Sequence, residues 1–130
     1  MANFKTHLIT GAAIGGGILV LNNLLEQGKR VQAGQQPGLE RAELLGQLLL
    51  GAGIGGLAGV LPDILEPADN PRHRKTFHSL LLALLLYRGM VKLGQSGLPA
   101  DTQVCLQGGA AAYLSHLLLD LTTPMGLPLL

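Results

Sequence analysis

Three stretches of at least 18 residues contain no Asp, Glu, Lys or Arg, and they constrain the fold of this chain most strongly. They cover residues 6–25, 44–62 and 102–119. Because a helix needs about 20 consecutive, mostly apolar residues to cross a bilayer, each stretch predicts a transmembrane helix. A fourth uncharged stretch, residues 76–87, is shorter, but it extends to Val91 if the long side chain of Arg88 reaches toward the membrane surface. The sequence therefore predicts an all-α, four-helix transmembrane bundle whose helices alternate in direction.

The low share of charged residues also favours a membrane protein. Asp, Glu, Lys and Arg make up 13% of the 130 residues, against about 25% in an average soluble domain. The length predicts one domain, residues 1–130, and the net charge of +1 gives no reason to expect a nucleic-acid partner. Two alternatives stay open. One is a very apolar soluble bundle, and the other is a cleavable signal peptide that begins after Lys5 and is cut near residues 31–33.

Glycine and alanine recur at intervals of four residues within the three long stretches. The first stretch has Gly11 and Gly15, the second has Gly51, Gly55 and Gly59, and the third has Gly108 and Ala112. Residues four apart lie on the same face of a helix, so each series forms one narrow face of small side chains. In a bilayer such faces allow helix backbones to approach closely. We therefore predict that these three helices pack against one another through their small residues.

Each small-residue face ends in a side chain that can bind a metal. Continued by one step of four, the first series reaches His7, the second reaches Asp63, and the third reaches His116 and then Asp120. The same spacing places the Cβ atoms of His116 and Asp120 about 6 Å apart, which suits two ligands of one ion. A histidine that only hydrogen-bonds to a neighbouring carboxylate, without a metal, fits this pair equally well.

All four histidines are predicted to lie at one end of the bundle. In helices that alternate in direction, the starts of the first and third and the ends of the second and fourth share one side of the membrane. His73 precedes the third helix, His78 lies at its start, and Glu66 follows the second, so all three lie on this side. Ionisable residues at membrane depth usually have a function. The sequence therefore predicts a cluster of imidazole and carboxylate side chains at this end.

Four short motifs carry a family resemblance. They are Ala2-Asn3-Phe4-Lys5-Thr6-His7, Leu61-Pro62-Asp63, His73-Arg74-Lys75-Thr76-Phe77-His78-Ser79 and Tyr113-Leu114-Ser115-His116, with Asp120 and Thr122 close behind. In order and over nearly the whole chain, they resemble motifs of bacterial membrane-bound metal-dependent hydrolases related to the YdjM protein. That family looks distantly similar to zinc-dependent phospholipase C domains, which also have an N-terminal histidine and a His-x-x-x-Asp helix.

The resemblance implies a set of metal ligands and a nearby arginine. Carried over residue by residue, it marks His7, Asp63, His73, His78, His116 and Asp120 as ligand candidates, with Arg74 beside them. Many relatives have a second aspartate where this chain has Leu65, so the next residue, Glu66, becomes the substitute ligand. The number of metal ions stays open. Mixed imidazole and carboxylate ligands favour zinc, and manganese also fits.

One functional hypothesis and two alternatives follow. A membrane-bound hydrolase would use the metal to supply hydroxide, with Asp63 or Asp120 orienting or deprotonating the water and Arg74 stabilising negative charge. Its substrate would be a phosphoester or lipid-like molecule at the face of the bacterial inner membrane. A non-enzymatic scaffold or partner-binding protein with a structural metal site is the first alternative, and a small transporter or channel is the second. The oligomeric state stays open, including a homo-oligomer.

Overall fold

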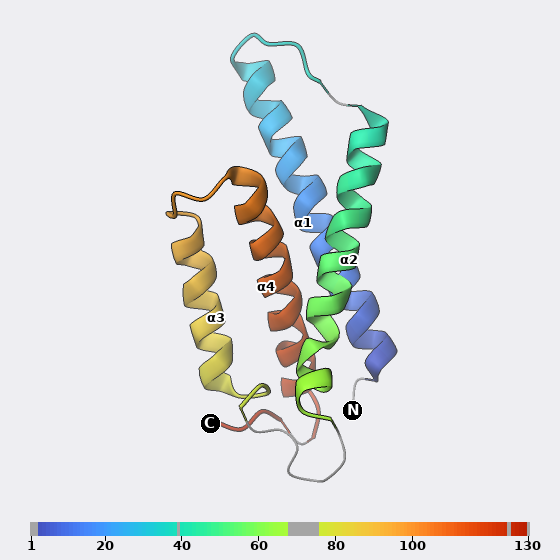
Figure 1. Cartoon of the computed structure of the whole chain (residues 1–130), viewed down its shortest axis with the longest axis vertical. Coiled ribbons are helices and arrows are strands. Elements are labelled where there is room, and N and C mark those ends of the chain that lie inside the picture. Colours follow the sequence, from blue (N-terminus) through green and yellow to red (C-terminus); the bar gives the residue numbers. More distant parts are fainter. Residues whose placement is uncertain (1–2, 39, 68–75, 125, 130) are drawn as a thin grey trace.

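The computed structural model of the chain describes residues 3–38, 40–67, 76–124 and 126–129. Within these residues all regular structure is helical, in the order α1 Phe4–Gln32, α2 Arg41–Leu65, α3 Leu80–Leu93 and α4 Ala100–Leu121. Successive helices alternate in direction, so the starts of α1 and α3 and the ends of α2 and α4 lie at one end of the molecule (Figure 1). We call this the histidine end, because His7, His78 and His116 lie there. The predicted all-α, four-helix architecture is confirmed.

The helices α1, α2 and α4 pack against one another through the predicted small-residue faces. The buried residues of α1 include His7, Gly11, Gly15, Leu19, Asn23 and Gln27, each four residues after the last. Gly51, Gly55 and Gly59 are buried in α2, and Gly108, Ala112, His116 and Asp120 are buried in α4. A Cβ on Gly55 would overlap the carbonyl oxygen of Gly11 and lie 2.8 Å from the Cα of Gly15. Only glycine allows this approach of α1 and α2, so the prediction of close packing through small residues is also confirmed.

The helix α3 lies outside this three-helix core and is shorter than a membrane span. Among the four helices it contacts α4, and not α1 or α2. Its 14 residues rise about 21 Å, less than the hydrocarbon thickness of about 30 Å. Residues 76–79 form a turn, and the Ser79 hydroxyl accepts a hydrogen bond from Leu82 N (3.2 Å), so the helix begins only at Leu80. The prediction that residues 76–91 form a membrane span is therefore corrected, because α3 is too short. Among the described residues, α1, α2 and α4 are the helices long and apolar enough to cross a membrane.

Most large apolar side chains lie on the outside of the bundle. Ile9 is 67% exposed and Leu57 is 70% exposed, whereas Leu19, Val60 and Leu117 are among the few that are buried. Water would penalise such a surface, but the hydrocarbon of a bilayer solvates it. The helix α1 contacts both α2 and α4 as a member of the bundle. The outward-facing apolar side chains favour a transmembrane bundle over a soluble one.

Candidate metal centre

The structure brings six predicted site residues together at the histidine end. His7 comes from α1, Asp63 from α2, Glu66 from the C-cap of α2, His78 from the turn before α3, and His116 and Asp120 from α4. All three histidines and Asp120 are almost fully buried, whereas the Asp63 side chain is 30% exposed. The other two predicted residues, His73 and Arg74, lie outside the described residues. The cluster therefore opens toward the surface at Asp63.

Two imidazoles and two carboxylates converge at the centre of the cluster. His78 Nε2 and His116 Nε2 are 3.2 Å apart. Asp63 Oδ1 lies 3.4 Å from the first nitrogen and 3.6 Å from the second, and Asp120 Oδ2 lies 3.7 Å and 3.6 Å from them. These nitrogen–oxygen distances exceed the usual hydrogen-bond range of about 2.7–3.2 Å. Two ligands about 2.05 Å from one zinc ion are about 3.2–3.7 Å apart at bond angles of about 100–130°, so either oxygen has the spacing of a third ligand beside the two nitrogens.

Hydrogen bonds on the far side of two rings turn their Nε2 atoms toward this centre. His116 Nδ1 lies 2.7 Å from the carbonyl oxygen of Gly59, which can only accept, so Nδ1 carries the proton. His78 Nδ1 lies 3.0 Å from the carboxylate oxygen Glu66 Oε2 and donates to it in the same way. A neutral ring with its proton on Nδ1 presents a lone pair on Nε2, as metal-binding histidines do. Two lone pairs 3.2 Å apart repel each other unless a proton or a metal ion lies between them.

The turn that carries His78 is tied to both α2 and α4. Glu66 Oε1 accepts a hydrogen bond from Thr76 N (2.8 Å), while its other oxygen contacts His78. From α4, the Tyr113 hydroxyl donates to the carbonyl oxygen of Phe77 at 3.0 Å. These bonds fix the position of the His78 ring. They also place Glu66 on the outer nitrogen of that ring.

The charge environment of His78 favours its protonated form when no metal is bound. Burial alone would lower the pKa of His78, because a charged imidazole loses hydration. Contact with the Asp63 and Glu66 carboxylates, together with the charge of Asp120, acts in the opposite direction and raises the pKa of His78 above its ordinary value of 6.5. A proton therefore competes with a metal ion for this side chain.

His7 approaches the cluster in a different geometry. Its ring stacks on the ring of His116, with centroids 3.6 Å apart and an interplanar angle of 24°. The rings of His78 and His116 are instead tilted by 58°, with centroids 5.2 Å apart. His7 Nε2 lies 3.6 Å from Asp120 Oδ1, and Asp120 Oδ2 is the oxygen that faces the other two histidines. His7 Nδ1 is buried and has no hydrogen-bond partner within the described part of the chain.

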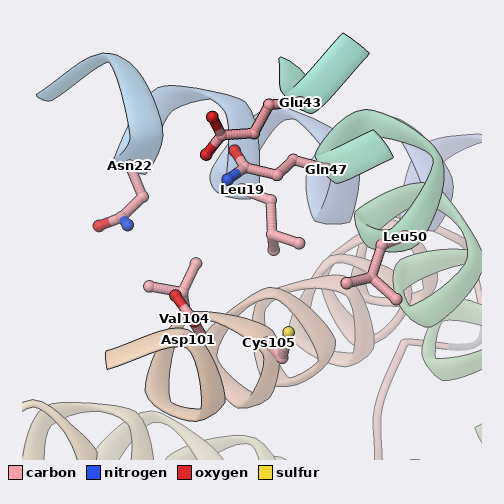
Figure 2. A pocket seen from close by; sticks show the side chains of 8 residues that line it. All are labelled: Leu19, Asn22, Glu43, Gln47, Leu50, Asp101, Val104 and Cys105. Atoms are coloured by element: carbon pink, nitrogen blue, oxygen red, sulfur yellow. The ribbon is translucent and has the colours of Figure 1, made fainter. Parts of the chain in front are cut away.

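A polar pocket of about 280 Å³, which was not predicted from the sequence, lies at the opposite end of the bundle. It is lined by Leu19, Asn22, Glu43, Gln47, Leu50, Asp101, Val104 and Cys105. Figure 2 shows Glu43 and Gln47 of α2 facing Asp101, Val104 and Cys105 of α4 across this pocket. None of the described lining residues is a histidine. The single cysteine of the chain therefore lies away from the candidate metal centre.

The series of residues four apart, which predicted the histidine end, also leads to this pocket when it is followed in the other direction. Followed backward from Gly51, the series in α2 reaches Gln47 and Glu43. Followed forward, the series in α1 reaches Asn23, whose Nδ2 donates to Glu43 Oε1 at 3.1 Å. Polar side chains therefore close both ends of the α1–α2 contact, with glycines between them.

The fold and the cluster together define a class: helical proteins that cross a membrane several times and gather histidines and carboxylates at one face. Over residues 1–130 the chain matches the family described as YdjM inner membrane protein, and it belongs to this family. The match agrees with the three candidate spans and is consistent with a multi-pass location in the inner membrane. No curated protein and no solved structure matches the chain.

Proposed function

We propose that this protein is a membrane-bound, metal-dependent hydrolase whose ion, zinc or else manganese, is held by His78, His116 and Asp120, with Asp63 beside it. The observation that carries the proposal is the pair of Nε2 atoms 3.2 Å apart, on rings whose Nδ1 atoms are hydrogen-bonded elsewhere. A divalent ion placed between the two nitrogens could bind both lone pairs. It would also offset the two carboxylates, whose charges are costly to bury without compensation.

The exposed edge of the cluster supports a catalytic role for Asp63. Among these four residues its side chain is the one with clear access to solvent, at 30% exposed. A bound zinc ion supplies activated water by lowering its pKa toward 7. Asp63 is placed to orient or deprotonate a water molecule that enters at this edge. The role of Arg74, stabilising the negative charge that develops on the substrate, follows from its motif and from the chemistry of a guanidinium.

The position of the cluster supports a substrate at the membrane face. The cluster lies at the end of three candidate spans, where polar headgroups meet the hydrocarbon. A phosphoester or lipid-like molecule can reach such a site from the bilayer surface. The burial of His78, His116 and Asp120 also favours a second candidate, a scaffold in which four protein ligands close a structural site.

A hydrolysis assay on purified protein in detergent tests the proposal. Zinc-loaded and manganese-loaded samples are assayed against phosphoesters and phospholipids. We expect His116→Ala to abolish metal binding and activity together, because it removes a ligand. Arg74→Ala should lower activity and leave the metal bound, because arginine is a donor and not a ligand. Arg30→Ala, in the last turn of α1 at the opposite end, is the matched control and should change neither. If a folded, metal-loaded sample hydrolyses none of these substrates and loss of the metal unfolds it, the scaffold replaces the hydrolase.

A further inference from the structure

We infer that the histidine end binds a second divalent ion, held between His7 and Asp120 beside the ion proposed above. The inference rests on the proposed function for the first ion. It assigns His7, the histidine that stacks on His116, to a site of its own. Asp120 then connects the two ions through its two oxygens.

The ring geometry separates His7 from the first ion. An ion about 2.05 Å from Nε2 lies about 3.2 Å from the centroid of that imidazole ring, so two rings on one ion at a tetrahedral angle have centroids about 5 Å apart. The rings of His78 and His116, at 5.2 Å, meet this condition. The rings of His7 and His116, at 3.6 Å, would require an angle of about 70° between the two metal bonds. His7 and His116 are therefore suited to neighbouring ions and not to the same ion.

The stacked rings direct both Nε2 atoms toward the same carboxylate. Their planes differ by 24°, and the nitrogens face Asp120, His7 toward Oδ1 and His116 toward Oδ2, each at 3.6 Å. Ions on these two nitrogens would therefore be neighbours on one carboxylate. Two-metal hydrolytic sites have ions about 3.5–4 Å apart. Asp120 is thus in the position of a carboxylate that bridges two ions.

Asp63 supplies a further donor, and the burial of His7 supplies the reason for an ion. One carboxylate oxygen of Asp63 lies within 4.8 Å of donor atoms of both His7 and His116. His7 is 2% exposed, its Nδ1 has no hydrogen-bond partner among the described residues, and its Nε2 is too far from Asp120 for a hydrogen bond. An ion at Nε2 would give this nitrogen the partner that Asp120 is too far away to provide. Three protein ligands would leave positions open for water or substrate.

Two ions at this spacing favour a phosphoester among the proposed substrates. Such a pair stabilises both the attacking and the leaving oxygen of an in-line displacement at phosphorus. For a diester, the water oxygen forms a bond to phosphorus while the bond to the ester oxygen breaks. One water proton ends on the released alcohol, and the product is a phosphate monoester. Asp63, at the exposed edge, is placed to carry the proton between the two oxygens.

Metal stoichiometry and manganese spectroscopy test the second ion. Full-length protein in detergent is loaded with Mn²⁺, its metal content is measured, and its electron paramagnetic resonance spectrum is recorded. We expect two ions per chain and the spectrum of a spin-coupled pair. The variant His7→Phe keeps a ring against His116 but lacks a ligand nitrogen, so it should bind one ion and give the spectrum of an isolated Mn²⁺. Ile9→Phe adds a ring on the same turn of α1, where the side chain is 67% exposed, and should keep both ions.

The outcomes separate this inference from the proposed function. One ion per chain in the unmodified protein overturns the second site, and that measurement needs no variant to fold. Two ions in both the unmodified protein and His7→Phe also overturn it, because His7 would then not be a ligand. Hydrolysis by a protein with one ion leaves the hydrolase standing and removes the second ion. Two coupled ions without hydrolysis support the second ion and count against the hydrolase.

Discussion

Glu66 illustrates how one side chain can support the proposed metal centre from outside its ligand set. The family resemblance implies it as a substitute ligand, because Leu65 stands where that resemblance leads us to expect a second aspartate. In the structure its two oxygens contact Thr76 N and His78 Nδ1. A carboxylate on the outer nitrogen of a metal-binding histidine fixes the tautomer and the ring orientation. Direct ligation by Glu66 stays a prediction, and its observed contacts are those of a group that positions His78.

Replacement of Glu66 by glutamine measures this role. An amide has no negative charge to hold the proton on His78 Nδ1, so Glu66→Gln should weaken zinc binding by about 10–100-fold. Calorimetric titration in the presence of a competing chelator gives the affinity. Glu26→Gln is the matched control, because that carboxylate pairs with Lys29 on the exposed surface of α1. Equal zinc affinities in the two variants would show that Glu66 does not support the centre.

The three long helices could be predicted from their long uncharged stretches, and their packing could be predicted from the four-residue spacing of glycine and alanine. The residues at which these helices begin and end were harder to predict. The helix α1 begins at Phe4, since the Asn3 side chain accepts a hydrogen bond from Thr6 N (3.0 Å). At the other boundary α2 continues past Pro62 to Leu65, and the Pro62 carbonyl oxygen accepts from Glu66 N at 2.9 Å. These ends depend on local capping rather than on hydropathy.

The late start of α3 could not be predicted by any spacing rule. It depends on the bond from Tyr113 to the Phe77 carbonyl, between residues 36 positions apart, and on the bond from Leu80 N to the Pro128 carbonyl oxygen (2.9 Å). Uncharged composition alone suggested a longer helix. The turn that results is the element that delivers His78 to the cluster.

A single methyl group on the α1–α2 contact tests the role of glycine packing. Gly55→Ala places a Cβ against the backbone of Gly11 and Gly15, so the helices must separate. We expect a loss of about 1–3 kcal/mol of stability, as for other overpacked interfaces, and weaker zinc binding because His7 and Asp63 move apart. Gly53→Ala is the control, since its Cβ would meet nothing within 4 Å. Thermal unfolding in detergent gives the comparison, and equal midpoints for the two variants would contradict the packing account.

The whole molecule is suited to a bilayer through its surface. Large apolar side chains face outward, and small and polar ones face inward, which is the reverse of a soluble bundle. We predict that the protein fractionates with membranes, resists extraction by high salt and requires detergent for purification. Recovery of a monodisperse protein from the soluble fraction without detergent would contradict this prediction.

The convergence of His7, Asp63, His116 and Asp120 could be predicted at the scale of the whole bundle, because close packing of three helices brings the ends of their faces together. The relative rotation of the rings could not. Whether two histidines stack at 3.6 Å or tilt at 5.2 Å depends on small helix rotations and on the bond from His116 Nδ1 to Gly59. That difference is the basis on which we assign His7 to a second ion.

The central claim is that this membrane bundle gathers imidazole and carboxylate side chains around a metal ion. X-ray absorption at the zinc edge of zinc-loaded protein in detergent tests it most directly. The account predicts a first shell of nitrogen and oxygen at about 2.0–2.1 Å, scattering from the outer atoms of imidazole rings, and no sulfur, since Cys105 lies at the opposite end of the bundle. The same spectrum of His116→Ala should lose this imidazole scattering together with the zinc. A protein that binds no stoichiometric zinc, or a zinc shell without imidazole, would contradict the account.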